Sequence, residues 1–220
     1  MQRLNVSVGV LVFVGLVCTQ AAAQDIPEEA RKGLSNTLHG SFVVFRAKAQ
    51  EDLKLTDEQK EKLEEHLKVL IQDAMQLFQK IDGLKPEERE KELKAYRPKV
   101  QEKLAAVLKE TLKDDQRKRL RQIEVQQEGA LALWHGDGQI AKDLKITDEQ
   151  RKQFMPVIQE MQKKIEPLTN EAKSGGNAQE IWPKIMTIRR AHEDRIVALL
   201  TDAQKKQWQE MVGKALNLDE

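Results

Sequence analysis

The five residues Leu55-Thr56-Asp57-Glu58-Gln59 form a pattern that recurs along this chain of 220 residues and predicts where its helices begin. The pattern reads ITDEQ at residues 146–150 and LTDAQ at residues 200–204, with a weaker copy, LKDDQ, at residues 112–116. A threonine followed three residues later by a glutamine is typical of a capping box. In that arrangement the hydroxyl accepts a backbone hydrogen bond, and the glutamine side chain bonds back to the cap. Each copy therefore predicts a helix start.

Other residues of the four copies support this interpretation. Their acidic residues would lie in the first helical turn, where the helix dipole favours negative charge. The apolar residue before each cap can pack against the following turn as a hydrophobic staple. The weak copy has Lys113 in place of threonine, so Asp114 is predicted to cap there instead. The predicted capping residues are Leu55, Thr56, Gln59, Leu112, Asp114, Gln116, Ile146, Thr147, Gln150, Leu200, Thr201 and Gln204.

The spacing of the four copies divides the chain into two similar halves. The longer sequence DLKLTDEQ at residues 52–59 matches DLKITDEQ at residues 143–150, and a second copy follows each of them at a comparable distance. We interpret this recurrence as an internal duplication with small insertions and deletions. It predicts a first helical half over residues 24–128 with a leading segment, a connector over residues 129–142 and a second half over residues 143–220.

The segments behind the caps have the periodicity of amphipathic helices. Apolar residues recur at spacings of three and four through residues 63–81 and again through residues 154–168. Gly83 and the turn at residues 174–177 would end these two helices, and a second helix would follow each turn. We therefore expect an all-α fold with two similar halves of long antiparallel amphipathic helices, extended or cradle-like.

Residues 1–23 have the pattern of a secretory signal peptide. Arg3 precedes an apolar run over residues 6–17, and three alanines at 21–23 form a small-residue cleavage site. The run is shorter than the roughly 20 residues that a membrane-spanning helix needs. A retained anchor and a lipoprotein signal are the alternatives. We expect cleavage after Ala23, no stable membrane insertion afterwards, and a mature protein that is periplasmic or otherwise secreted.

Composition excludes several function classes for such a mature chain. Cleavage would remove the only cysteine, Cys18, and one basic residue, Arg3, which leaves 36 basic and 36 acidic side chains. A balanced chain of this kind is not typical of nucleic-acid-binding proteins. Without a cysteine, the mature chain would have no disulfide and no thiolate ligand. We expect no nucleic-acid partner.

The histidines and hydroxyl residues give no clear sign of catalytic chemistry. No histidine has another at i+4, although His66 and His192 have acidic neighbours in the sequence, which keeps carboxylate–imidazole metal binding as an alternative. No serine or threonine lies in a nucleophile elbow. We expect that the chain is not an enzyme, that it has no catalytic residue and no cofactor, and that it has no metal site.

The apolar stripes of the long helices are either core or an open binding surface. Long helices with few aromatic residues make a shallow core, so part of a stripe could remain open on a concave face. Methionine would suit an adaptable surface of this kind, but methionine on a helix stripe is also common in plain cores. The candidate client-binding residues are Leu67, Ile71, Phe78, Phe154, Ile158 and Met161.

The L-T-x-x-Q word at the head of long charged helices resembles the Spy/CpxP family of periplasmic proteins, which has zinc-resistance-associated relatives. The resemblance covers residues 50–216. Members of that family are exported, helical and cysteine-poor, and they carry two such words per protomer. Spy-like members form a cradle-shaped antiparallel dimer that holds unfolded clients without ATP. CpxP-like members inhibit a sensor kinase during envelope stress.

The resemblance implies a periplasmic ATP-independent chaperone-like protein or an envelope-stress adaptor, with unfolded or specific envelope proteins as partners. This chain has four words rather than two, which predicts a monomeric pseudo-dimer or a homodimer. Two alternatives remain: an envelope metal-binding or metal-resistance protein, and a helical scaffold that binds one specific envelope partner.

Overall fold

Every regular element in the part of the chain that the structure describes is a helix, which confirms the predicted all-α class. The structure is a computed structural model that describes residues 26, 31–32, 35, 40–134 and 138–218. The predicted signal peptide lies outside these residues, as do the side chains of Phe78 and Arg97. In chain order the main elements are η1 (Gly40–Phe45), α3 (Ala47–Asp52), α4 (Asp57–Ile81), α5 (Pro86–Thr111), α6 (Asp114–Glu128), η2 (Ala130–Leu133), α7 (Gln139–Asp143), α8 (Asp148–Lys173), α9 (Ala178–Ala198) and α10 (Asp202–Val212).

The chain divides into two compact units. The first runs to Gln127 and also includes the C-terminal residues from Lys214, and the second comprises Glu128–Gly213. The predicted halves differ from these units in two places. The connector, with η2 and α7, belongs to the second unit, and the last residues of the predicted second half belong to the first. Common ancestry of the two halves remains a prediction.

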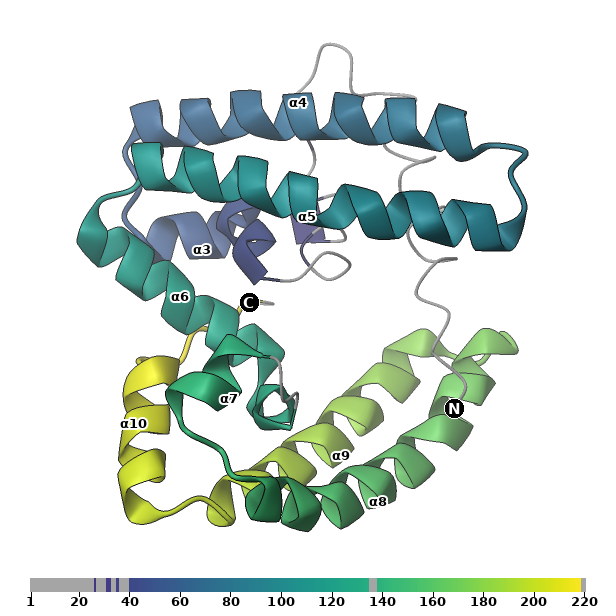
Figure 1. The fold of residues 1–220 in the computed structure, drawn as a ribbon, viewed down its shortest axis with the longest axis vertical. Coiled ribbons are helices and arrows are strands. Elements are labelled where there is room, and N and C mark those ends of the chain that lie inside the picture. Colours follow the sequence, from purple (N-terminus) through teal and green to yellow (C-terminus); the bar gives the residue numbers. More distant parts are fainter. Residues whose placement is uncertain (1–25, 27–30, 33–34, 36–39, 135–137, 219–220) are drawn as a thin grey trace. The chain divides into compact units, whose positions relative to one another are not determined.

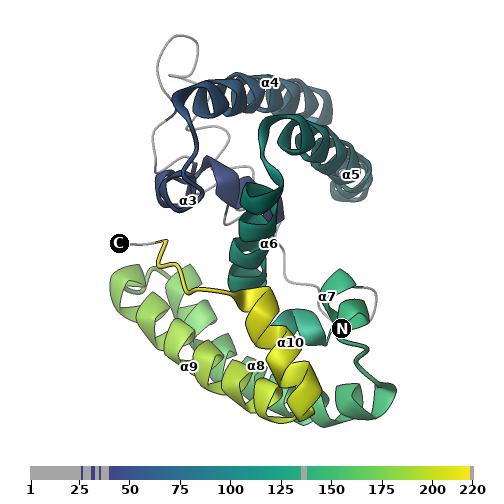
Figure 2. The same ribbon diagram turned by 90° about the vertical axis from the view of Figure 1, so that its left-hand side faces the viewer.

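The first unit is built around a helical hairpin of α4 and α5, which lie side by side in Figures 1 and 2. Its core forms because apolar side chains recur every three or four residues on the facing sides of these helices, as in Leu63 and Leu67 of α4 and Leu104 and Leu108 of α5. The cluster at residues 42–45 in η1 packs into the same core. The first unit therefore has a core of its own.

The second unit is built around the hairpin of α8 and α9 (Figure 1). Phe154 and Ile158 of α8 and Ile181 and Ile196 of α9 are buried in it. The unit begins with a turn at Gly129, where φ is 68° and a Cβ atom would lie 2.6 Å from a carboxylate oxygen of Glu193. This backbone conformation, with ψ of −174°, is the reason for glycine at this position, because it is essentially limited to glycine, whereas the flexible Glu193 side chain could move aside for a Cβ atom.

The structure decides between the two interpretations of the apolar stripes. All of the candidate client-binding residues whose side chains are described are at most 7% exposed, so they form core and not an open surface. The reason is that the second helix of each hairpin covers the stripe of the first. These buried candidates are Leu67, Ile71, Phe154, Ile158 and Met161. The side chain of Phe78 lies outside the described part.

Within the described part of the chain, none of the helices combines the length and the apolar character needed to cross a membrane.

Candidate functional site

Three of the four copies of the L-T-x-x-Q word form capping boxes with both reciprocal hydrogen bonds, and they lie at residues 55–59, 146–150 and 200–204. At the start of α4, the Thr56 backbone N–H donates to Gln59 Oε1 at 3.0 Å, and the Gln59 N–H donates to Thr56 Oγ1 at 3.2 Å. Thr147 and Gln150 make the same two bonds at the start of α8, both at 3.2 Å. At the start of α10 the two bonds are 3.0 and 3.3 Å. These helices begin where the sequence predicts.

The fourth word differs from the prediction, because α6 begins at Asp114. This places Asp114 at the first helical position and Lys113 at the cap, so the expectation that Asp114 caps the helix is wrong. The Asp114 carboxylate instead accepts a hydrogen bond from Arg117. The lysine side chain has no acceptor for a backbone N–H. Half of the box still forms, since the Lys113 N–H donates to Gln116 Oε1 at 2.9 Å.

The two glutamines of the first unit bond directly to each other through their side-chain amides, and we call this pair the first clasp. Gln59 Nε2 donates to Gln116 Oε1 at 2.8 Å, and Gln116 Nε2 donates to Gln59 Oε1 at 3.1 Å. Each Nε2 also donates to a carbonyl at the end of another helix. Gln59 reaches Thr111 O of α5 at 2.7 Å, and Gln116 reaches Leu53 O, just after α3, at 3.2 Å. The first clasp therefore joins the ends of α3 and α5 to the starts of α4 and α6.

Gln150 and Gln204 form a second clasp in the second unit. Gln150 Nε2 donates to Gln204 Oε1 at 2.7 Å, and Gln204 Nε2 donates to Gln150 Oε1 at 3.1 Å. Gln204 also donates to Leu144 O, after α7, at 3.0 Å, and Gln150 approaches Leu199 O, after α9, at 3.5 Å. The second clasp therefore joins the ends of α7 and α9 to the starts of α8 and α10, as the first clasp does for the corresponding helices of the first unit.

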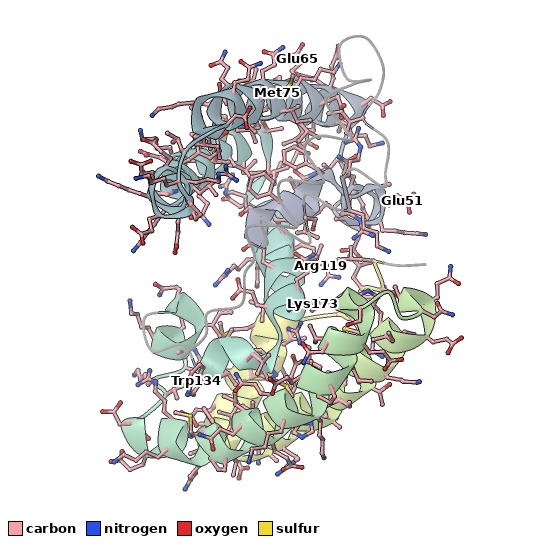
Figure 3. The ribbon with its side chains drawn as sticks, turned by 90° about the vertical axis from the view of Figure 1, so that its right-hand side faces the viewer. Glu51, Glu65, Met75, Arg119, Trp134 and Lys173 are labelled. Carbon is pink, nitrogen blue, oxygen red and sulfur yellow. The ribbon has the colours of Figure 1, made fainter. Side chains whose placement is uncertain are left out.

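The apolar residues of the words anchor both clasps. Leu55, Leu112, Ile146 and Leu200 are all buried. An ion pair adds a further link in the first unit, where Arg119 Nε of α6, labelled in Figure 3, lies 2.5 Å from Asp52 Oδ2 at the end of α3. Both of these side chains are mostly buried, so the pair is shielded from screening by salt.

A tight helix end precedes each of the words at residues 55–59 and 146–150, and the sequence pattern did not predict it. Lys54 and Lys145 adopt a left-handed backbone, with φ of 51° and 53°. Around Lys54, the Leu55 N–H donates to Gln50 O at 3.1 Å and the Lys54 N–H donates to Glu51 O at 3.0 Å, and the same pair of bonds recurs at Lys145. This is the Schellman arrangement, which usually has glycine at the left-handed position. The absence of glycine is why the pattern was not visible.

The chemistry of the clasps is that of a structural joint. A primary amide has two N–H donors and one oxygen with two lone pairs. In Gln59 and Gln116 both donors and both lone pairs are used by the bonds described above. Gln116 is only 6% exposed. A clasp of this kind holds helix ends and leaves no capacity for a ligand at the amides.

The two described histidines, His66 and His192, belong to different units. His192 is buried, with Nδ1 2.6 Å from Ile188 O and Nε2 3.6 Å from Glu160 Oε1. Burial lowers the pKa of His66 below its ordinary value, and the positive charge of Lys103 lowers it further. His39 and His135 lie outside the described residues. Across the described residues, no group of three or more histidine, cysteine or acidic side chains is placed to hold a metal ion.

Hydrogen bonds from Lys164 and then from Arg195 lower the pKa of Glu160 to about 2. Glu160 Oε1 accepts from Lys164 Nζ at 2.8 Å, and Oε2 accepts from Arg195 Nη1 at 2.7 Å. The second bond joins α8 to α9, so this carboxylate helps to hold the hairpin of the second unit together.

Large apolar side chains remain exposed at positions outside the set of candidate client-binding residues. Trp182 is 57% exposed and Met186 is 40% exposed, and both lie on α9. They are four residues apart and therefore share a helix face, one turn from each other. The signal was present in the sequence, because the inward stripe of α9 uses Ile181 and Ile185 and leaves residues 182 and 186 beside it. Among the side chains that the structure describes, the other exposed large apolar residues are Val69, Met155 and Leu199.

Comparison with known proteins gives this chain no family. No model of a known protein family matches it, and neither the curated proteins nor the solved structures contain a match.

Proposed function

We propose that this chain is an exported, all-helical binding protein of the chaperone-like or envelope-stress-adaptor type, which holds polypeptide partners without ATP. The observation that carries the proposal is the exposed pair Trp182 and Met186 on α9. The L-T-x-x-Q words and their resemblance to the Spy/CpxP family support it. The binding surface is then the exposed face of α9 that carries this pair and not the buried stripes.

The chemistry of the pair suits contact with exposed apolar segments. Tryptophan is over-represented among the residues that dominate binding energy at protein interfaces. Methionine is flexible and polarisable, so it adapts to partners of different shape. The side chains lie on a helix whose two ends are held, by Asn177 capping its start and by the second clasp near its end. A fixed helix can present these side chains without ordering itself on binding, which lowers the entropic cost of association.

Aggregation of an unfolded client, followed by light scattering, tests the proposal. The full chain should suppress aggregation at near-stoichiometric amounts. Trp182→Ala combined with Met186→Ala should reduce this suppression several-fold, while Lys184→Ala, an exposed position on the same helix, should leave it unchanged. Circular dichroism checks that all variants remain helical. Equal suppression by the double variant and the control would show that α9 does not carry the activity. No suppression by a folded wild-type chain would contradict the chaperone-like reading and favour an adaptor with one partner.

A further inference from the structure

The C-terminal segment Lys214–Leu218 docks on the first unit, although α10, which precedes it, belongs to the second. Gly213 ends α10 with φ of 62°, and the described residues after it, 214–218, form no helix or strand. Leu216 and Leu218 are partly buried against the core of the first unit, while Ala215 and Asn217 are exposed. This alternation is that of an extended segment with one face against a surface.

Gln126 holds the backbone of this segment with both ends of its side-chain amide. Its Nε2 donates to Lys214 O at 2.7 Å, and its Oε1 accepts from the Leu216 N–H at 2.9 Å. The amide thus supplies the donor and the acceptor that a residue of a neighbouring strand would supply. Because residues 214–218 contribute only backbone atoms to these bonds, any extended polypeptide could make them.

Arg46 holds the far end of the segment. Its Nη2 donates to Leu218 O at 2.6 Å, and the residue is only 4% exposed. A guanidinium is a strong donor in a site that excludes water. Arg46, Gln126 and the adjoining apolar core therefore contact two backbone carbonyls and one backbone N–H of the segment, together with two leucine side chains that are two residues apart. We call this set the tail-docking surface.

We propose that the tail-docking surface is a binding site for extended polypeptide segments of the pattern leucine-x-leucine, and that residues 214–218 are its built-in occupant. The inference deepens the proposed function and rests on it for the identity of the competing ligand, an unfolded polypeptide. The tail has no regular secondary structure, and its two inward side chains are partly exposed. Segments of this kind lie at the low end of local stability and open without global unfolding.

The covalent link between the tail and the rest of the chain predicts how tightly a free peptide binds to this site. A segment joined to its own binding surface competes at an effective concentration in the millimolar range. A free peptide with a dissociation constant on the order of 0.1 mM for the vacant surface would then bind the intact chain about tenfold more weakly. Weakening the contacts of the tail should therefore make the free peptide bind about tenfold more tightly.

The experiment uses full-length chains and a fluorescent peptide, KALNLDE, that copies residues 214–220. Leu216→Ala combined with Leu218→Ala removes the apolar contacts of the tail, and Lys214→Ala, whose side chain is exposed, is the matched control. By fluorescence anisotropy, the double variant should bind the peptide about tenfold more tightly than the wild type or the control. The isomer KLANDLE, which has the same composition but a different leucine spacing, should bind several-fold more weakly. Equal affinity for wild type and double variant, or for both peptides, would overturn the inference.

If the double variant fails to fold, the wild-type chain carries the test. Saturating KALNLDE should accelerate hydrogen exchange at the Leu216 amide, because the peptide displaces the tail from Gln126. Unchanged exchange at saturation would mean that the tail is a permanent strap and would overturn the inference.

The same variants separate this inference from the proposed function. Peptide binding without any suppression of client aggregation would retain the docking surface and refute the chaperone-like role. Suppression of aggregation without peptide binding would retain the role and refute the docking surface.

Discussion

Replacing the two glutamines of the second clasp, singly and together, tests whether their amides bond to each other. Gln204→Leu removes the donors to Leu144 O and to Gln150 Oε1 and the acceptor of the Thr201 N–H, and it leaves the Gln150 amide without its partner. A net hydrogen bond contributes about 1 kcal/mol, and leaving a partly buried group such as the Gln150 amide unpaired costs about 1 kcal/mol, the low end of the range for buried groups. We expect Gln204→Leu to lower the free energy of unfolding by about 2–3 kcal/mol. Gln150→Leu should cost about 2 kcal/mol, because its bond to Leu199 O is longer.

The double variant is the informative one. With both amides replaced, neither side chain is left unpaired, and two apolar groups face each other. Its loss should therefore be smaller than the sum of the single losses by about 1–2 kcal/mol. Gln153→Leu is the matched control, because Gln153 is exposed on the same helix as Gln150. It should change the free energy of unfolding by no more than about 0.5 kcal/mol.

Tryptophan fluorescence during urea unfolding reports on this unit. All three tryptophans, at positions 134, 182 and 208, lie in the second unit, and Trp208 is buried one turn after Gln204. The free energy of unfolding follows from the midpoint and slope of the transition. Single losses that add within about 0.3 kcal/mol in the double variant would refute the reasoning, since independent sites are additive.

Three other predictions follow from particular residues. Lys145→Gly should raise the free energy of unfolding of the second unit by roughly 0.5–1 kcal/mol in the same urea assay. The reason is that a left-handed backbone costs a residue with a side chain about 1–2 kcal/mol, which exceeds the entropic cost of glycine. A loss of stability would contradict the left-handed backbone at Lys145. Glu160 has its pKa lowered from 4.5 to about 2 by hydrogen bonds from Lys164 and then Arg195, so its stabilising contribution is present above about 4.5 and is lost as the pH falls toward 2. Glu160→Gln should therefore flatten the dependence of the urea midpoint on pH in this window, and an unchanged slope would count against the pairing. Burial, with a smaller contribution from Asp73, raises the pKa of Tyr96 from 10.0 to about 12, so its contribution to stability is present below 10 and is lost as the pH rises to 12. Since Tyr96 is the only tyrosine, an absorbance titration of the folded chain should show a single midpoint near 12, and a midpoint near 10 with the helices intact would refute this.

The sequence predicted the helix starts at Asp57, Asp148 and Asp202, because a capping box is complete within four residues and needs no partner from elsewhere in the chain. At the weak word the same reasoning selected Asp114 as the cap and was wrong by one residue. There the glutamine holds the register. Gln116 is bonded to Gln59, 57 residues away, and this long-range contact places Lys113 at the cap despite its unsuitable side chain.

The sequence also contained the apolar stripes but could not say what covers them. Periodicity identifies which side of a helix is apolar, and the same period fits a closed core and an open surface. The exposed pair Trp182 and Met186 was not among the candidate client-binding residues, for the related reason that exposure depends on which neighbouring helix packs alongside.

By itself, the sequence determined that this chain is helical and where α4, α8 and α10 begin, since these properties depend on contacts between residues at most four positions apart. Only the tertiary structure decided that the glutamines pair as clasps, that the candidate client-binding side chains are core, and that residues 214–218 return to the first unit. The clasps and the returning segment join residues that are 54 or more positions apart, and the core forms between the two separate helices of each hairpin. The physical reason is that such contacts depend on how the helices pack in each unit, which no local pattern records.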